Sequence, residues 1–530
     1  MRKLILLMAL LPCLLSAQQN GADRVEIFLY LLIENSKSDF IPIRDPRLIN
    51  FGSQLADWAK KVGLTPKQAE AEIKQWTTVQ NNQENLYCKG LANFYLKQFG
   101  KAAQFFNQSV ISKSEQLKKF ELKDGSFNEE GETLILEGVR DLRLLGHVLH
   151  LGLDYANAIK AYQQALPFIS KEVNPDLWAA TVLDLGQSLA DLAVGNQKTT
   201  DEKALDGAQE AFQKALEIFK RETHPGKWAE AQNSLAETDL YLGLRTKNEK
   251  GASYLSLAQT EIQNALQTTQ REKRPYFWAR IQSNLGVALS EQGFRKIGEE
   301  SNRLILDSIS AYRRALEVRT YKSTPAEWAQ TQSNLATTYF FLKDWPKVAE
   351  CNTNVLQVFP DSKAAYQDAS ELYQKVLFDF ETAFQLNKRW LERHPDDLID
   401  KIKLIEKYFT TSRFTECQAE LKPFKQSEDY SALVYSVIDI LDISSQLALN
   451  KFAGVPAILD GLIARLIVQG DNFKIGLNLD GIKTFVSQNE SLAPHRAWLG
   501  QFYAAVEQEN RDAILKSLQD AKANFKPAAN

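Results

Sequence analysis

The chain has 530 residues, with 63 Lys and Arg against 66 Asp and Glu, which gives a formal net charge of −3. The charges are spread evenly and form no basic block, so the composition gives no support for nucleic-acid binding. The length exceeds that of one ordinary globular core, a limit that a stack of repeats avoids because each unit packs only on its neighbours.

Residues 1–17 have the pattern of a secretory signal peptide. Arg2 and Lys3 give a basic start, Leu4 to Leu15 is an apolar run, and small residues follow, ending at Ala17. This order predicts a leader that is cleaved after Ala17. We therefore expect an exported protein, either periplasmic or secreted.

Cys13 lies within this apolar run, and Pro12 precedes it. A bacterial lipoprotein signal places small residues just before its Cys, so the sequence favours a soluble exported protein over a lipid-anchored one. No later segment offers about 20 uncharged apolar residues. The most apolar candidate, Tyr430 to Leu449, carries Asp439 and Asp442. No transmembrane span is therefore expected.

Residues 18–82 are predicted to form an N-terminal helical cap. Leu55 to Val62 has the pattern of a short amphipathic helix. Thr65, followed by Pro and then by Gln68 three positions on, is typical of a helix start with a capping box, and this helix is expected to run to about Val79. Terminal units of a stacked-repeat protein need such a cap to close the exposed end.

Four copies of one motif follow with a fixed period of 50 residues: PDLWAATVLDLG, PGKWAEAQNSLA, PYFWARIQSNLG and PAEWAQTQSNLA, starting at Pro175, Pro225, Pro275 and Pro325. A fixed period of this size indicates a stacked-repeat architecture. Each Pro suits the first turn of a helix, where a missing N–H costs nothing. Trp and the Leu seven residues later share one helical face, so we interpret both as structural rather than ligand-binding. These signature residues are Trp178, Trp228, Trp278, Trp328, Leu185, Leu235, Leu285 and Leu335.

A second helix repeats with the same period. Small, aromatic and small residues recur at i, i+4 and i+7, as in Ala208, Phe212 and Ala215. In the helix before it, a Gly or Ala follows each signature Leu, as Gly186 does after Leu185. Small residues beside a large one predict close helix-on-helix packing.

These two helices resemble the helix pair of the tetratricopeptide repeat (TPR), a family whose unit has about 34 residues. The resemblance implies an α-α superhelix in which both turns of the 50-residue form are lengthened. The family's usual Trp lies one helical turn later, at the position that Gln282 occupies here. We therefore expect Trp278 and its equivalents to pack between neighbouring units rather than within one.

The resemblance covers about residues 84–424 and sets the predicted domains. Residues 83–135 are a first TPR-like unit with a charged linker, and 136–360 are a TPR solenoid that contains the 50-residue repeats. Residues 361–425 are degenerate TPR-like units, and 426–530 are a C-terminal helical region, either a cap or a partner-binding domain. The predicted fold class is all-α, a right-handed TPR-like superhelix of helix pairs with helical N- and C-terminal caps.

No motif of a common catalytic or cofactor site occurs: the chain has no P-loop, no GxSxG, no HExxH and no GxGxxG that opens a helix. His147 and His150 share one helix face, but no third ligand lies near them in sequence, so no metal is predicted. Cys88, Cys351 and Cys417 are odd in number and widely spaced, and we interpret them as small buried residues. We expect no cofactor and no enzymatic activity. Clustered carboxylates with raised pKa values in a cleft would favour an enzyme instead.

In TPR proteins the first helix of each pair lines a concave groove, and the resemblance implies the same role here. Amide, hydroxyl and charged groups along such a groove can hydrogen-bond an extended or helical peptide, or they can be a solvated face. We expect Arg280→Glu with Asn284→Ala to leave stability nearly unchanged. The candidate partner-binding residues are Glu230, Asn233, Glu237, Arg280, Ser283, Asn284, Gln330, Ser333 and Asn334.

The sequence therefore favours an exported, non-enzymatic scaffold that binds another protein through this groove. One alternative is a glycan- or nutrient-binding envelope protein, and a second is a cell-wall hydrolase built on a helical solenoid. No nucleic-acid partner is expected. The identity of the protein partner and the oligomeric state stay open.

Overall fold

The computed structural model describes residues 21–39, 51–82, 84–195, 202–426, 430–469 and 479–525. Within these ranges the chain is helical and carries no β-strand, only an isolated bridge between Glu121 and Phe127. The all-α fold predicted from the sequence is confirmed. The predicted leader, residues 1–17, lies outside the described residues.

The helices belong to two units, Met1–Thr331 and Gln332–Asn530, and the boundary falls inside α15 (Pro325–Phe341). The first unit holds α2 (Gly21–Asp39), α3 (Gly52–Lys61), α4 (Pro66–Asn81), α5 (Leu86–Tyr95), α6 (Phe99–Leu117), α7 (Glu129–Leu151), α8 (Tyr155–Ala165), η2 (Leu166–Phe168), α9 (Pro175–Gly195), α10 (Glu202–Ile218), α11 (Pro225–Arg245), α12 (Glu249–Thr268), α13 (Pro275–Phe294) and α14 (Gly298–Leu316). The second unit holds α16 (Trp345–Val358), α17 (Lys363–Lys375), α18 (Phe380–Arg393), α19 (Leu398–Thr410), α20 (Phe414–Gln426), α21 (Ala432–Ala448), α22 (Val455–Gln469), α23 (Leu479–Gln488), η4 (Glu490–His495), α24 (Arg496–Glu507) and α25 (Arg511–Asn524).

Helix α4 begins at the capping box that the sequence predicts, whereas α3 begins at Gly52, three residues before the predicted start at Leu55, and ends at Lys61. The Gln68 N–H donates to Thr65 Oγ1 at 3.3 Å, and the Thr65 N–H donates to Gln68 Oε1 at 2.9 Å, so the predicted capping box is present. Two residues after α3 ends, Gly63 takes a φ of 73°, a left-handed conformation that suits glycine. α2 buries an apolar face and contacts α4, α5 and α7, and it also reaches α13.

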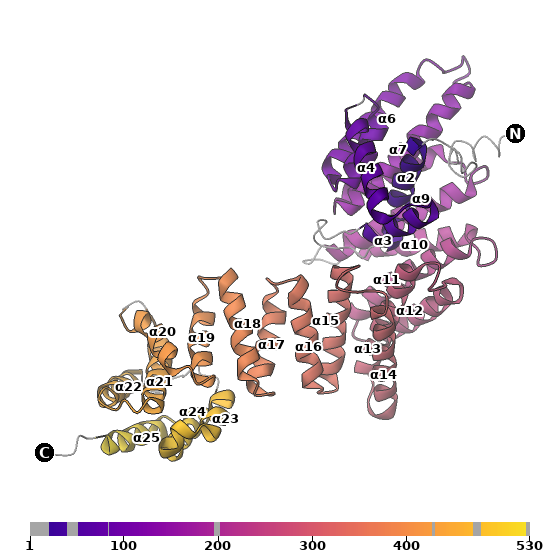
Figure 1. Ribbon diagram of the computed structural model, residues 1–530. Helices are drawn as coiled ribbons and strands as arrows, with labels where there is room; N and C mark the ends of the chain where they lie inside the picture. Colours follow the sequence, from indigo (N-terminus) through magenta and orange to yellow (C-terminus); the bar gives the residue numbers. More distant parts are fainter. Residues whose placement is uncertain are drawn as a thin grey trace. The chain divides into compact units, whose positions relative to one another are not determined.

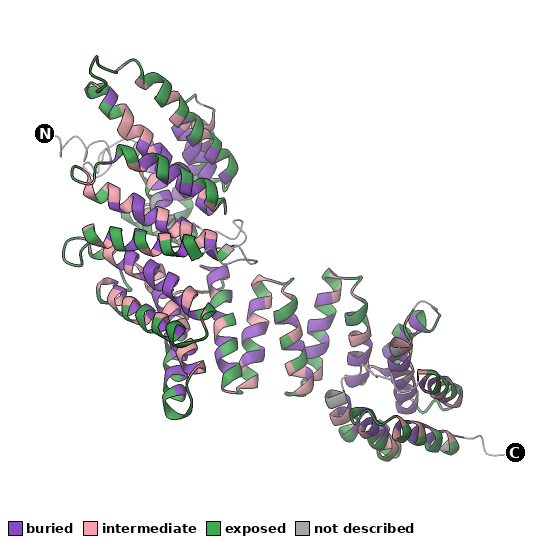
Figure 2. Cartoon of the chain, turned by 180° about the vertical axis from the view of Figure 1, so that it is seen from behind, coloured by how far each residue is buried: buried purple, intermediate pink, exposed green. Residues whose placement is uncertain are grey.

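Each helix packs mainly against the helices before and after it in the chain, which is the contact pattern of a solenoid. Figure 1 shows this order clearly for α16 to α19 of the second unit, which stand side by side. In Figure 2 the helices carry buried residues along the sides that face their neighbours and exposed residues along the outer sides. The TPR-like helical solenoid predicted from the sequence is therefore the observed fold class.

In the first unit, the first helices of successive pairs also contact each other: α7 contacts α9, α9 contacts α11, and α11 contacts α13. The second helices of these pairs, α8, α10, α12 and α14, contact one another much less. Because the first helices lie closer together, they line the inner face of this unit. α2 contacts three of these first helices, α5, α7 and α13, so part of the inner face is covered by the chain's own N-terminal helix.

The two helices of a pair approach closely because a glycine on the first faces an aromatic ring on the second. A Cβ added at any of these glycines would lie under 3 Å from a ring carbon, closer than side-chain atoms pack. The pairs, with the shortest distance that such a Cβ would have, are Gly90 with Phe106 (2.6 Å), Gly146 with Tyr162 (2.5 Å), Gly186 with Phe212 (2.7 Å) and Gly286 with Tyr312 (2.5 Å). The small–aromatic–small pattern thus sets the spacing of the helices.

One repeat satisfies the same constraint with different residues. Ala236 stands where its neighbouring repeats have Gly186 and Gly286, and the residue at the ring position is Ile262 instead of Phe or Tyr. Ala236 and Ile262 are both fully buried, at 0% exposure. Compared with the neighbouring repeats, a larger side chain on the first helix is therefore matched by a smaller side chain on the second.

The signature Trp side chains are half-buried rather than fully buried, whereas the Ala after each one, such as Ala279 at 0% exposure, is enclosed. Trp178 packs against two apolar clusters, one centred on α7 and α8 and one on α9 to α11, and so lies between neighbouring pairs. A residue seven positions earlier covers three of the rings. These contacts are Lys171 over Trp178 at 4.7 Å, Arg271 over Trp278 at 5.3 Å, and Tyr321 edge-on to Trp328 at 5.6 Å.

The C-terminal region predicted to be helical, residues 426–530, contains α21 to α25. With α19 and α20 these helices share one apolar core, which includes Phe409, Leu441, Leu462 and Phe502. Throughout the described part of the chain, no helix combines the length and the apolar character needed to cross a membrane.

We expect Gly286→Ala to destabilise the protein by about 1–3 kcal/mol. The added methyl would overlap the ring of Tyr312, and this ring is too tightly packed to move away. The Tyr312 ring is 1% exposed. Adding Tyr312→Ile should recover part of this loss, because Ala and Ile form the natural pair in the preceding repeat. Thermal unfolding followed by circular dichroism measures both effects.

The control is Gly138→Ala on α7, where a new Cβ meets nothing within 4 Å. Since Ala has the higher helix propensity, this change should be neutral or stabilising. If the two Gly→Ala variants melt at the same temperature, close approach does not set the helix spacing.

Candidate functional site

Polar side chains join each first helix to the next on the inner face of the first unit. Between α7 and α9, Arg143 lies 3.1 Å from Asp184, and His150 Nε2 lies 3.1 Å from Asp191 Oδ2. Between α9 and α11, Gln187 donates to Ser234 Oγ at 3.1 Å. We call this set, together with the α11–α13 contacts described next, the polar ladder.

The ladder is densest between α11 and α13. Arg280 donates through Nε and Nη2 to the two carboxylate oxygens of Glu237, at 2.7 and 2.5 Å. Asn284 donates both to Asn233 Oδ1 at 2.9 Å and to Glu237 Oε1 at 2.8 Å. A bidentate pair of this kind adds geometric specificity to its energy, so it fixes the register of the two helices.

The structure brings most of the predicted partner-binding residues together, but as bonds within the protein. Glu230, Asn233, Arg280 and Ser283 are buried. Glu237 and Asn284 are half-buried, and both belong to the polar ladder. One repeat on, Gln330 and Ser333 are exposed and Asn334 is half-buried. Partner binding by the whole set stays a prediction.

The structure contradicts the premise of one prediction from the sequence, namely that Arg280 and Asn284 both face solvent. The prediction that Arg280→Glu with Asn284→Ala leaves stability nearly unchanged depends on that premise. The Arg280 side chain is only 8% exposed and is paired with Glu237, which is 30% exposed. Removing one partner of a buried ion pair leaves a desolvated charge, which is costly.

Glu230 shows how the surrounding charges offset burial on this face. It is buried, and burial disfavours its ionised form. Lys227 and Arg274 each donate to its carboxylate at 2.7 Å, and their charges outweigh the effect of burial and hold the pKa of Glu230 below its ordinary value. Arg274 belongs to α13's N-terminal turn, so this contact also links neighbouring pairs.

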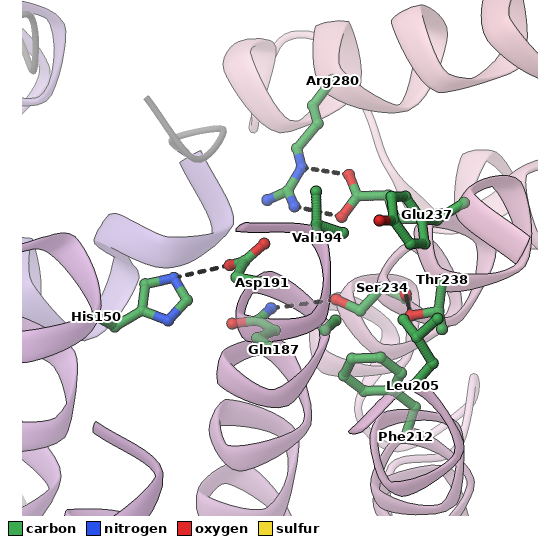
Figure 3. A pocket seen from close by; sticks show the side chains of 12 residues that line it. His150, Gln187, Asp191, Val194, Leu205, Phe212, Ser234, Glu237, Thr238 and Arg280 are labelled. Carbon is green, nitrogen blue, oxygen red and sulfur yellow. Dashed lines mark hydrogen bonds and ion pairs between the residues drawn. The ribbon is translucent and has the colours of Figure 1, made fainter. Parts of the chain in front are cut away.

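A hollow of about 60 Å³ lies among the rungs of the ladder, lined by side chains of α7, α9, α10, α11 and α13 (Figure 3). His150, Asp191, Glu237 and Arg280 point into this region in hydrogen-bonded or ionic pairs. Its apolar wall comes from Ala190, Val194, Leu205 and Phe212. Tyr241 also lines it, and the buried hydroxyl oxygen of this residue has no hydrogen-bond partner among the described residues. The hollow can therefore take a small group that offers both apolar surface and a hydrogen bond.

His150 lies between a hydroxyl and a carboxylate, the order of groups in a nucleophile–base–acid triad. Its Nδ1 is 2.9 Å from Ser188 Oγ, and its Nε2 is 3.1 Å from Asp191. Ser188 is at 0% exposure, and its hydroxyl donates to the Asp184 carbonyl at 3.1 Å. A substrate therefore has no path to this oxygen, and the cluster serves to join α7 to α9.

His147 is likewise held within the protein. Its Nδ1 lies 2.6 Å from the Arg143 carbonyl oxygen and 3.2 Å from the Tyr162 hydroxyl, and its Nε2 lies 3.5 Å from Asp184. Among the described residues, no group of three or more His, Cys, Asp or Glu side chains has the arrangement of a metal site. Burial raises the pKa of each of the thiols of Cys88, Cys351 and Cys417 to about 12.

Reasoning from the sequence overlooked several buried charged residues of the repeats. Among them, Asp239 and Arg319 are each 3% exposed. One repeat earlier the same positions hold Leu189 and Thr269. Alignment of the 50-residue repeats position by position would have found both, because each places a charge where another repeat has an uncharged residue.

We expect Arg280→Glu to destabilise the protein by about 3–5 kcal/mol, because it removes the cation from a buried pair and sets a second carboxylate beside Glu237. The matched control is Gln330→Glu, which introduces the same carboxylate one repeat later at an exposed position. Its effect should stay within about 0.5 kcal/mol. Thermal unfolding at neutral pH compares the two, and equal losses would show that the polar ladder does not join α11 to α13.

No protein-family model matches this chain, and no curated protein matches it. Among similar solved structures is the TPR domain of P58(IPK), with 16% identity over 73% of this chain and 99% of that chain, and a TM-score of 0.20. A human IFIT1 dimer with PPP-AAAA has 14% identity over 86% of this chain and 94% of that chain, with a TM-score of 0.27. A human IFIT1 dimer with m7Gppp-AAAA has 9% identity over 99% of each chain and a TM-score of 0.29. The packing of the chain itself identifies its fold as an all-α solenoid of TPR-like helix pairs.

Proposed function

We propose that this protein is an exported, non-enzymatic scaffold that binds a segment of another protein on the inner face of its first unit. The binding point is the hollow among the rungs of the polar ladder. The partner would place one side chain in the hollow and lay its backbone along the half-buried polar groups beside it.

The observation that carries this proposal is the mixed lining of the hollow. Ligand sites combine apolar walls with a few fixed polar groups. Here Val194 and Leu205 supply apolar surface, while the ladder fixes Gln187, Asp191 and Glu237 in place. Because these polar groups are already ordered by their bonds to neighbouring helices, a partner loses less entropy in binding them.

The proposed mechanism involves no covalent step. The side chains of the hollow hold one another in hydrogen bonds and ion pairs, and their contribution is a preformed surface. Recognition then depends on shape and on hydrogen bonds to the partner, as it does for peptides bound on other rigid frames.

We expect Val194→Trp to abolish capture of the partner, because the larger ring fills the hollow. The measurement is a cross-linked pull-down from the envelope fraction with the mature protein. The matched control is Leu244→Trp, one repeat later, because Leu244 is 42% exposed against 41% for Val194 but does not line the hollow. Both variants should melt within a few degrees of the wild type.

A protein recovered with the wild type and with Leu244→Trp, but lost with Val194→Trp, supports a scaffold that uses the hollow. A partner retained by Val194→Trp places binding elsewhere on the chain. Recovery of no protein partner at all argues against the scaffold and directs the search to a glycan ligand.

We expect the exported protein to begin at Gln18, because Ala17 ends the leader pattern. Mass spectrometry of the N-terminal peptide from the envelope fraction and the growth medium measures this. Leu10→Arg, which interrupts the apolar run, should keep the protein inside the cell with its leader attached. Recovery of exported protein that still carries Met1 would contradict cleavage.

A further inference from the structure

Two acidic side chains meet between three helices of the first unit. Asp239 on α11 is 3% exposed, and Gln209 on α10 donates to its Oδ1 at 2.6 Å. Glu261 on α12 shares a hydrogen bond with the Asp239 carboxyl. Glu261 Oε2 is buried and accepts no hydrogen bond from a donor among the described residues. We call Asp239 and Glu261 the carboxyl pair. Gln209 is the amide that donates to it.

The carboxyl pair replaces an apolar contact of the other repeats. One repeat later the positions of Asp239 and Glu261 hold Leu289 and Ala311, and these two belong to one apolar cluster. One repeat earlier the positions hold Leu and Ala again, at 189 and 211. An apolar pair at this place is enough to pack the helices, so packing alone does not account for two carboxyls.

Within the described part of the chain, no cation balances the pair. Only Gln209, Glu261 and burial act on the pKa of Asp239, and only Asp239 and burial act on that of Glu261, among the described residues. The charged side chains of the surrounding helices interact with other groups instead: Glu210 with Lys214 on α10, Asp191 of α9 with His150, and Glu291 with Arg295 on α13.

Asp239 is buried and Glu261 is half-buried. Two such carboxyls in contact, with no cation beside them among the described residues, share one proton rather than ionise together. Burial, reinforced by the charge of Asp239, raises the pKa of Glu261 to about 9. Burial raises the pKa of Asp239 to about 6. At neutral pH the two carboxyls therefore share one proton, and the hydrogen bond that this proton forms ties α12 to α11.

Two of the three helices that meet at the carboxyl pair, α10 and α11, also line the hollow. On α10, Gln209 sits on the same helical face as Leu205 and Phe212, which line the hollow. On α11, Thr238 and Tyr241 line it, and they flank Asp239 in the sequence. A shift of α10 or α11 at the carboxyl pair would therefore move two walls of the hollow.

We propose that Gln209, Asp239 and Glu261 form a proton-dependent lock, which holds α10, α11 and α12 together while one proton is shared and loosens them when it is lost. The role of the lock in regulating the hollow rests on the proposed function. The lock itself concerns the chain alone and can be tested without a partner.

The sign of the pH dependence follows from the raised pKa values. The folded protein holds a proton that the unfolded chain releases near the ordinary pKa of Glu. The stabilisation is fully present below that ordinary pKa and is lost as the pH rises, first through about 6 and then through about 9. Stability should therefore fall between pH 5 and pH 9.

The first test is thermal unfolding of the full chain between pH 5 and pH 9. Wild-type Tm should fall across this range by about 5 °C more than that of Glu261→Gln, which keeps a donor to Asp239 but cannot ionise. The double variant Asp239→Leu with Glu261→Ala, which restores the pair of the neighbouring repeats, should also lose this pH dependence and should exceed the wild-type Tm at pH 9. Glu249→Gln, an exposed change on the same helix, should keep the wild-type dependence.

Equal pH dependence in the wild type and Glu261→Gln would overturn the proposal, and so would equal dependence in the wild type and the double variant. Either comparison decides the question if the other variant fails to fold. Loss of the pH dependence in Glu249→Gln as well would also count against the lock, because the effect would then not belong to the carboxyl pair.

The second test is hydrogen exchange at pH 9, which compares the wild type with Glu261→Gln at the same pH so that the intrinsic rates cancel. Amides of α12 should exchange at least several-fold faster in the wild type, while those of α14 should not differ. Identical exchange in α12 would refute loosening. A lock that passes both tests while Val194→Trp still captures its partner would leave the lock standing and remove the proposed binding site.

Discussion

The close approach of the two helices in each pair is the constraint on which the rest of the structure depends. In four of the described helix pairs an aromatic ring of the second helix lies where a Cβ on the first helix would have to be, as with Tyr312 over Gly286. This contact leaves no space for adjustment, because protein interiors are packed as densely as organic crystals. In one repeat Ala236 and Ile262 replace the glycine and the aromatic residue. The repeats therefore keep the combined volume of the two facing side chains, whereas the identity of each residue can change.

With the pairs held rigid, the inner face becomes a place where polar groups of neighbouring first helices meet in fixed register. Arg280 and Glu237 illustrate the result: each of two guanidinium nitrogens faces its own carboxylate oxygen. A buried ion pair contributes little net stability but is costly to break. The ladder therefore acts against sliding of one pair on the next, and the surface that remains around the hollow is ordered before any partner arrives.

The half-buried Trp residues also help to hold neighbouring helix pairs together, at the N-terminal ends of the first helices. Lys171 and Arg271 each lie over a Trp ring and also pair with a Glu of the following second helix, Glu217 and Glu317. A cation held between a ring and a carboxylate ties the loop of one pair to the helix of the next. The long turns of the 50-residue repeat are thereby attached to the solenoid rather than left as free loops.

The sequence by itself determined the repeat period, the capping box at Thr65 and the small residues that face each aromatic ring. It also determined the helix starts at Pro175, Pro225, Pro275 and Pro325. These features depend on residues that lie close together in one helix or recur at one spacing. It did not determine which polar groups face solvent. Arg280 and Asn284 read as surface residues on one helix and are bonded to the neighbouring one. The hollow and the carboxyl pair also arise only in the tertiary structure, since the hollow joins side chains from five helices and the carboxyl pair joins side chains from two. The burial of a side chain, and the pKa shift that burial causes, depend on which side chains of a neighbouring helix pack against it. The periodicity of one helix carries no information about those neighbours.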